Sequence, residues 1–217
     1  MDVYEALYTT RAMRRVKADP IPVEVQKKIL DAAIRAPSGG NSQTWSFLLV
    51  DDPEIKAQLG PIYRECMSTL WATIYKERIE TANATPDDPE SVEMLKIQRS
   101  AQHLADHFEA YPLLLFSFTQ FDQGSICPAT WSAMLAARAE GVGSAWTSVF
   151  LFQLDRVLDI LGVPKDQGWQ FSSCVTFGYP TGRWGVAARR PAHEVAFRNR
   201  WGAPVGFEIP EPLWSPT

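Results

Sequence analysis

The sequence predicts a single domain built from both helices and strands, of the α/β or α+β class. Its 217 residues suit one such domain better than two. Amphipathic helical patterns are interspersed with short, continuously apolar runs, which are typical of strands buried on both faces. Hydrophobic residues make up 46% of the chain, so a substantial core can form and disorder is not expected.

The first third predicts two helices and one strand. A short helix near the start is closed by Thr9 and Thr10. A second helix, residues 23–36, ends before Pro37, because proline disfavours helical dihedral angles in the residue that precedes it. The apolar run at 45–50 predicts a buried central strand.

The middle of the chain predicts long helices around a second strand. Residues 53–80 are expected to be mostly helical, with a break at Gly60–Pro61. The proline-rich stretch 81–91 is expected to be a loop tip or a lid. A helix over 92–110 and a buried strand over 113–118 follow.

The last third predicts four elements and an irregular tail. The elements are a helix at 125–140, a strand or extended link at 144–148, a helix at 154–161 and a strand at 171–177. From Gly178 the chain is rich in turn residues. The tail at about 198–217 mixes prolines with large aromatics that it cannot bury within itself, so we expect it to lie extended on its own domain or on a partner subunit.

Composition excludes several classes of function. The net charge of −4 disfavours a nucleic-acid binder. The three cysteines lack metal-binding spacing, which favours reduced thiols in a cytoplasmic protein and no metal site. The N-terminus does not look like a signal peptide, and the longest apolar run is too short to cross a bilayer, so no membrane role is expected.

Two arginine clusters are candidates for binding a phosphate. Arg11, Arg14 and Arg15 lie at the end of the first helix, and Arg189 and Arg190 lie far along the chain. Guanidinium groups match phosphate oxygens in a bidentate way. A lone cluster of this kind is more often a solvated basic patch, and spacing alone does not show that the two clusters meet.

Two further segments could hold a flat ligand. The stretch 38–43 combines adjacent glycines with hydroxyl and amide side chains, although it also fits a helix cap followed by a turn. The stretch 143–148 leads out of a helix and could offer free backbone N–H groups, or be an ordinary link. Neither is a P-loop or a dinucleotide-binding fingerprint.

Conventional catalytic groups are scarce. His103 and His107 have a spacing that can hold a metal, but no third ligand supports one. Cys127 is interpreted as a small buried residue rather than a nucleophile. A chain with polar cradles and separated arginines, but no evident acid or base, is best explained by a cofactor that carries the chemistry.

Four segments together resemble the nitroreductase family of FMN-dependent, NAD(P)H-oxidising flavoproteins. They are residues 11–22, 36–45 and 141–148, and Gly178–Pro180 followed by Arg189–Pro191, in the family's order. The resemblance implies an α+β, three-layer nitroreductase-like fold, with a central mixed β-sheet flanked by helices and an extended C-terminal arm. It also implies one domain over 1–217, with a lid or insert at about 76–100, and a homodimer with FMN at the interface.

The resemblance assigns cofactor-binding roles to thirteen residues and a catalytic role to none, because the flavin carries the chemistry. The segment for the phosphate and ribityl chain matches Arg11, Ala12, Arg14 and the adjacent Arg15. The loop that the other subunit lays against the flavin matches Pro37, Ser38, Gly39 and Asn41. The backbone facing flavin N5 matches Trp146, Thr147 and Ser148, and the second phosphate contact matches Arg189 and Arg190.

The sequence departs from the family pattern at three positions. Ala12 stands where a hydroxyl residue is common, Thr44 where proline is usual, and Ser148 where some members have an acidic residue. One phosphate hydrogen bond is therefore in question. The region of residues 71–100 has no alignable pattern and is expected to shape the substrate pocket, from which either Arg99 or Gln102 could reach the flavin.

The resulting hypothesis is an oxidoreductase that passes a hydride from NADH or NADPH, through flavin N5, to a small electron-poor aromatic acceptor such as a nitroaromatic or a quinone, by a ping-pong mechanism. The alternatives are an FMN-binding or storage protein, and other flavin chemistry on the same scaffold, such as dehalogenation, flavin fragmentation or ene reduction. The sequence does not decide between NADH and NADPH or name the physiological acceptor.

Overall fold

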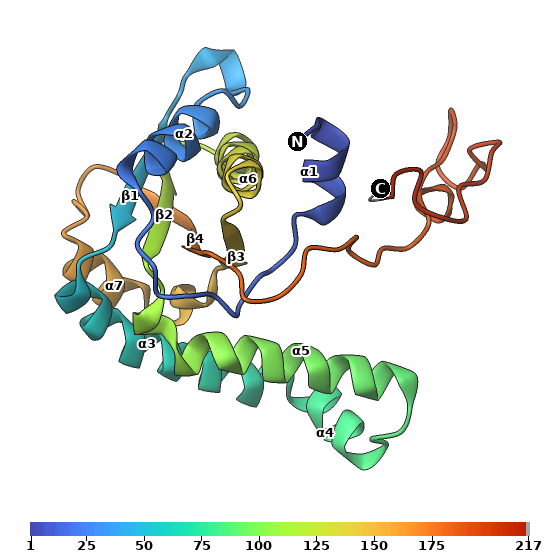
Figure 1. Cartoon of the computed structure of the whole chain (residues 1–217), viewed down its shortest axis with the longest axis horizontal. Helices are drawn as coiled ribbons and strands as arrows, with labels where there is room; N and C mark the ends of the chain where they lie inside the picture. Colours follow the sequence, from blue (N-terminus) through green and yellow to red (C-terminus); the bar gives the residue numbers. More distant parts are fainter. Residues whose placement is uncertain (216–217) are drawn as a thin grey trace.

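The computed structural model describes residues 1–215 (Figure 1). Its helices are α1 (Val3–Thr9), α2 (Val23–Ala33), α3 (Pro53–Ala72), α4 (Lys76–Ala84), α5 (Pro89–Asp106), α6 (Gln123–Ala139) and α7 (Leu154–Leu161). Its strands are β1 (Trp45–Val50), β2 (Leu113–Thr119), β3 (Gly143–Thr147) and β4 (Gln170–Gly178). Short 3-10 turns are η1 (Gly39–Asn41), η2 (Phe108–Ala110), η3 (Val149–Gln153) and η4 (Ala192–Glu194).

The four strands form one sheet in the order β1-β2-β4-β3, and every neighbouring pair is antiparallel. The expectation of a mixed sheet is therefore wrong for these strands. β2 and β3 do run in the same direction, as a strand–helix–strand unit through α6 favours, but β4 is inserted between them and pairs with both. Among residues 1–215, parallel pairing is limited to a single bridge between Ala12 and Ser144.

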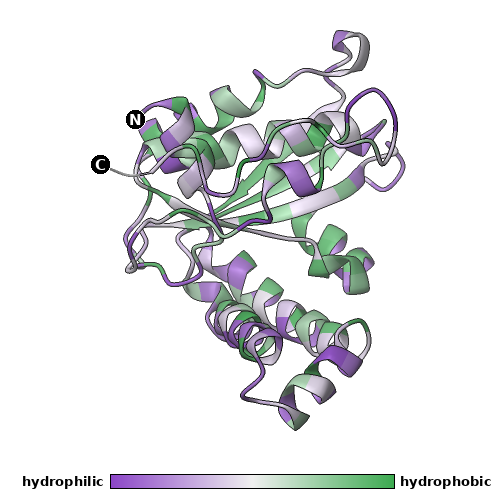
Figure 2. Cartoon of the chain, turned by 90° about the vertical axis from the view of Figure 1, so that its right-hand side faces the viewer, coloured by the Kyte–Doolittle hydropathy of each residue, from purple (hydrophilic) through white to green (hydrophobic). Residues whose placement is uncertain are grey.

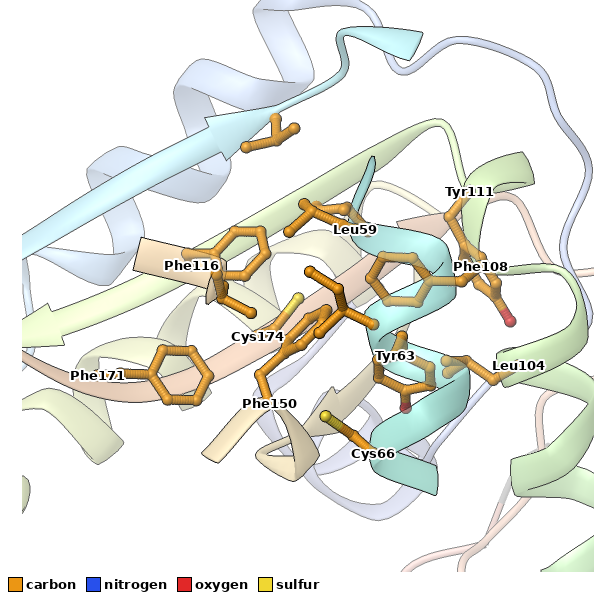
Figure 3. Close-up of a cluster of buried hydrophobic side chains, with 14 of the residues drawn as sticks. Leu59, Tyr63, Cys66, Leu104, Phe108, Tyr111, Phe116, Phe150, Phe171 and Cys174 are labelled. Atoms are coloured by element: carbon orange, nitrogen blue, oxygen red, sulfur yellow. The ribbon is translucent and has the colours of Figure 1, made fainter. Parts of the chain in front are cut away.

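Helices cover both faces of the sheet, which confirms the α+β, three-layer architecture (Figure 2). On one face α3, α5 and α7 contribute the buried residues Tyr63, Leu104 and Val157 to an aromatic-rich core (Figure 3). On the other face α2 and α6 bury smaller side chains such as Ile29 and Ala133. Because both faces are covered, all of β2 is buried, as its continuous apolar run predicts. The same expectation is wrong for β1, which lies at the edge of the sheet and has only Val50 buried, since β1 has a neighbouring strand on one side alone.

The predicted break at Gly60–Pro61 is wrong, because α3 runs through both residues. A Cβ on Gly60 would lie 1.9 Å from the Glu109 carboxylate, so glycine serves close packing against η2 rather than a turn. Pro61 removes one helical N–H donor, but the residues on either side of this pair, Leu59 and Ile62, are fully buried. Tertiary packing therefore overrides the local helix-breaking signal.

The predicted loop over 81–91 is shorter than expected. α4 continues to Ala84, and α5 begins at Pro89, where the Asp88 carboxylate accepts the backbone N–H groups of Glu90 and Ser91. The two helices pack as a hairpin that extends beyond the sheet (Figure 1). The following helix is also shorter than predicted, since it ends at Asp106 and continues as η2.

The two ends of the chain run side by side. Backbone N–H groups of Lys17 and Ala187 donate to the carbonyls of Tyr179 and Tyr8, so residues 8–17 lie antiparallel to residues 179–187. Beyond η4 the arm consists of turns, and it returns to α1, where the Trp214 ring lies 5.8 Å from that of Tyr8. The last two residues of the predicted tail, 216–217, lie outside the described residues. No helix within residues 1–215 has the length and apolarity needed to cross a membrane.

Candidate functional site

The outer edge of β3 brings two of the predicted segments together. β3 is an edge strand, and residue Ala12 bridges to Ser144 from its open side. The Met13 N–H donates to the Ser144 carbonyl at 2.9 Å. The backbone N–H and C=O of Ser144 therefore point away from β4, toward the open edge of the sheet. Hydrogen-bonding direction alternates along an antiparallel strand, so the peptide groups of Trp146 face the same edge. Backbone donors therefore lie beside the N-terminal arginine segment, as the sequence predicts for these two segments.

Glycine at position 143 allows this close approach. A Cβ there would lie 2.8 Å from the Met13 Cβ, which is too short for any real contact. Gly178 is similarly close to the Val16 side chain, at 2.7 Å. Both glycines are buried, so the N-terminal segment is seated on them.

We expect Gly143→Ala to destabilise the protein by about 1–3 kcal/mol, because the added methyl group forces Met13 and its neighbours off β3. Urea unfolding followed by circular dichroism measures this change. Gly185→Ala is the matched control, since a Cβ at position 185 would meet nothing within 4 Å. Equal stability of the two variants would contradict the proposed seating of the segment.

The three N-terminal arginines have different partners. The Arg11 Nη2 donates to the carbonyl of Arg183 at 3.0 Å, and the Arg14 Nη1 donates to the Ser100 Oγ on α5 at 3.2 Å. The carbonyl of Arg15 accepts the Thr181 N–H at 3.0 Å. The segment is thus tied to α5 on one side and to the C-terminal chain on the other.

The C-terminal arginines lie beside α1, in the wall of a cavity. A cavity of about 680 Å³ opens between α1, α6 and the C-terminal arm. Its lining includes Leu7, Tyr8, Thr10, Trp131, Arg189 and Arg190. Because Thr10 precedes Arg11, the two arginine clusters flank the same end of α1.

The five arginines have no ionic partner among the described residues. Within residues 1–215, no carboxylate lies within 4.0 Å of the guanidinium groups of Arg11, Arg14, Arg15, Arg189 or Arg190. Within this range they are therefore not paired with surface acids, although all but the half-buried Arg14 are exposed to solvent. The donor set suits an anion that can accept several guanidinium N–H groups.

The loop over Pro37–Asn41 is not brought to the arginine segment within one chain. The Gly39 N–H donates to the Ser125 Oγ at the start of α6, whereas Met13 contacts Gly143 just beyond its end. α6 has 17 residues, so it separates the two by about 24 Å. Gly40 has a φ of 57°, and a Cβ at either glycine would meet nothing within 4 Å, so the loop presents open backbone.

Two buried tyrosines of the aromatic-rich core hydrogen-bond to residues of the candidate site. Neither was predicted from the sequence. The Tyr63 hydroxyl donates to the Thr147 Oγ1 at 3.1 Å, and the Tyr111 hydroxyl donates to the Arg14 carbonyl. Figure 3 shows both tyrosines in the buried cluster. Burial raises the pKa of both phenols, so they stay protonated and remain donors at neutral pH. The available signal was that a buried tyrosine usually needs a partner for its hydroxyl.

The remaining candidates do not form a catalytic centre. The His103 and His107 rings lie 4.2 Å apart, and among residues 1–215 no three side chains of His, Cys, Asp or Glu gather as metal ligands do. Cys127, which was interpreted as buried, is only half-buried, and its Sγ lies 4.0 Å from the Ser172 Oγ. The Gln102 Oε1 accepts a hydrogen bond from the Trp71 indole N–H at 3.0 Å, whereas the Arg99 side chain is exposed.

Known proteins resemble this chain over most of its length. It is 29% identical to 5,6-dimethylbenzimidazole synthase of Rhodospirillum rubrum over 206 residues, which cover 91% of this chain and 94% of that protein. It is 28% identical to NADH dehydrogenase of Thermus thermophilus, covering 90% of this chain and 95% of that protein. A match to iodotyrosine deiodinase 1 of Rattus norvegicus is local: 32% identity over 84 residues, 35% of this chain and 30% of that protein.

Solved structures share the fold. Oxidised iodotyrosine deiodinase bound to FMN and 3-iodo-L-tyrosine aligns with a TM-score of 0.66 at 22% identity, covering 87% of this chain and 98% of that one. The FMN-dependent nitroreductase NfnB of Mycobacterium smegmatis, in complex with NADPH, aligns with a TM-score of 0.57 at 19% identity, covering 82% and 86%. The sequence model of the Nitroreductase family matches residues 7–179. The chain therefore belongs to the nitroreductase family of flavoprotein oxidoreductases.

Proposed function

We propose that this protein is an FMN-dependent enzyme that oxidises NADH or NADPH and reduces a small electron-poor aromatic compound, such as a nitroaromatic or a quinone. The observation that carries the proposal is the open edge of β3 beside the N-terminal arginine segment, with Arg189 and Arg190 in the wall of the cavity next to α1. Bound FMN supplies hydride transfer through its N5 atom. The protein's part is to hold the cofactor and to orient the reactants.

The residues present fit FMN by their chemistry. Arg11, Arg14, Arg15, Arg189 and Arg190 offer guanidinium groups without ionic partners, which suits the dianionic phosphate. The outward peptide groups at Trp146, with Thr147 and Ser148 beside them, would serve the polar edge of the flavin ring. Ala12 contributes its backbone alone, since it has no hydroxyl.

We propose that the site is completed by a second copy of the chain. The loop of Pro37, Ser38, Gly39 and Asn41 is separated from its own chain's arginines by the length of α6, so only another subunit's loop would lie against the flavin. Apolar side chains on α1, such as Tyr4 and Leu7, are exposed in the single chain. Burying them in a homodimer would stabilise that arrangement.

The nicotinamide donor is proposed from two relatives. NADH dehydrogenase of Thermus thermophilus is similar over almost the whole chain, and the NfnB structure that shares the fold contains NADPH. The donor and the acceptor would use the same face of the flavin in turn, as a ping-pong mechanism requires. The α4–α5 hairpin, which includes most of residues 76–100, would border that face, because Ser100 contacts Arg14.

Other flavin chemistry is the second candidate, favoured by specific relatives. The chain matches 5,6-dimethylbenzimidazole synthase at 29% identity across nearly its full length, and part of it matches iodotyrosine deiodinase. Fold does not fix the reaction, so the scaffold is compatible with either. An FMN storage protein is the third alternative, and it predicts no turnover.

The purified protein is expected to be yellow, with a flavin absorption spectrum that bleaches when NADH or NADPH is added without oxygen. Addition of a nitroaromatic or a quinone should then restore the oxidised spectrum. Bleaching without reoxidation by any such acceptor would favour the other flavin chemistries, and a bound flavin that neither nucleotide bleaches would favour storage. A colourless chain that takes up no FMN would refute the proposal.

A further inference from the structure

Arg138 is a buried cation that the proposed chemistry does not use. It lies in the last turn of α6 and is only 6% exposed. Its Nε donates to the Thr9 Oγ1 at 2.8 Å, and its Nη2 donates to the Glu5 Oε1 at 3.2 Å. Its guanidinium carbon lies 4.0 Å from the centre of the Trp184 ring. One side chain therefore contacts both α1 and the C-terminal segment.

Burying a guanidinium carries a large desolvation penalty, so a buried arginine at this position needs a physical explanation. Burial lowers the pKa of Arg138, and the charge and hydrogen bond of the Glu5 carboxylate offset that effect only partly. A hydrophobic residue would pack at this position without that desolvation penalty. Arginine differs from lysine in having a planar fork that can hydrogen-bond at its edge while its face stacks on an aromatic ring. Both uses occur here.

The contacts of Arg138 lead directly to the two arginine clusters. Thr9 lies two positions before Arg11 on the same segment. Trp184 follows Arg183, whose carbonyl accepts the Arg11 guanidinium, and the same stretch continues to Arg189 and Arg190. Fixing α1 against Trp184 thus fixes how the clusters face one another. Arg138 itself is only 6% exposed and directs its Nε and Nη2 donors to Thr9 and Glu5.

We propose that Arg138 is a positioning residue that clamps α1 to the C-terminal segment, so that Arg11 and the pair Arg189–Arg190 converge on one phosphate group. The inference rests on the proposed function, since the phosphate is that of FMN. It predicts that loss of the clamp weakens binding of the FMN phosphate and leaves binding of the flavin ring unchanged. General unfolding would impair both.

The experiment compares FMN with riboflavin, which has the same ring and ribityl chain but no phosphate. The Kd of each is measured from the flavin fluorescence of the apoprotein, for the wild type and for Arg138→Gln. The variant should raise the Kd for FMN at least about tenfold, equivalent to about 1.4 kcal/mol, and leave that for riboflavin within about twofold. Arg156→Gln is the matched control, because Arg156 is also ion-paired but exposed and bonded to Glu65, on α3. It should change neither Kd.

A second variant tests the clamp even if Arg138→Gln fails to fold. Trp184→Leu keeps the buried Arg138–Glu5 pair and removes only the stacking surface on the C-terminal segment, and it should show the same selective loss of FMN affinity. If Trp184→Leu lost affinity for both flavins equally, or for neither, the clamp would be wrong while the proposed function stood. A wild-type chain that binds neither flavin would overturn the proposed function and the clamp with it.

Discussion

Replacing Arg189 and Arg190 together with alanine is expected to raise the Kd for FMN by at least about 100-fold. Each charge-assisted hydrogen bond to a phosphate contributes roughly 1.5–3 kcal/mol, and the two guanidinium groups have no carboxylate partner within residues 1–215 to compensate for their loss. Titration of the apoprotein with FMN, followed by flavin fluorescence, measures the change. Both side chains are exposed, so the fold should be unaffected.

Arg198 and Arg200 provide the control for this double variant. They lie on the same arm, beyond η4, and are likewise exposed, but they are not part of the cavity beside α1. Replacing both with alanine changes the net charge by the same amount and should leave the Kd for FMN almost unchanged. Similar losses in the two double variants would show that overall charge, and not a phosphate site at Arg189–Arg190, governs the affinity.

Phe150→Ala is expected to lower the free energy of unfolding by about 3–5 kcal/mol, the range for removing a buried aromatic ring. Phe150 is fully buried, and its ring lies 5.2 Å from that of Tyr63, 5.5 Å from that of Phe108 and 5.7 Å from that of Phe116 (Figure 3). The cavity would form beside Tyr63, whose hydroxyl donates to Thr147 in β3. Urea unfolding monitored by circular dichroism measures the loss.

Phe121→Ala tests whether burial is the cause. Phe121 is 71% exposed on the loop before α6, so its removal should change stability by no more than about 0.5 kcal/mol. If Phe150→Ala were equally mild, the aromatic cluster would not be the main stabilising contact between α3 and the sheet. Because Phe150 follows Ser148 by two positions, the variant should also weaken FMN binding.

Most of the fold is predictable from local patterns, and the errors share one cause. The strands at 45–50 and 113–118 follow from unbroken apolar runs, and both form. Only the second is buried and interior, because β1 lies at the edge of the sheet and only Val50 in it is buried. The break at Gly60–Pro61 was wrong because the decisive contact, with Glu109, comes from a distant part of the chain. The antiparallel sheet was missed because strand order depends on where β4 inserts, which no local pattern records.

The segments of the candidate site could be predicted from the sequence, but the way they come together in the fold could not. The arginines at 11–15 and the glycine-ended segment at 143–148 stood out by residue type, and they meet at the edge of β3. The supporting residues carry weaker signals, because the Tyr63 and Tyr111 hydroxyls act from another layer of the fold. Arg138 was visible only as a charge among alanines on an otherwise apolar helix. The FMN-contacting role of the thirteen residues remains a prediction.

The pairing of residues 8–17 with residues 179–187 has a consequence for biosynthesis. The N-terminal arginines leave the ribosome first, but Arg11 and the carbonyl that it binds are 172 positions apart. Contacts of such long range form late in folding, since loop closure must precede them. The helices and the sheet can therefore pack together before residues 8–17 pair with residues 179–187. Flavin loading would then follow the synthesis of residues 179–190, and nascent chains stalled before Arg190 should be unable to retain the cofactor.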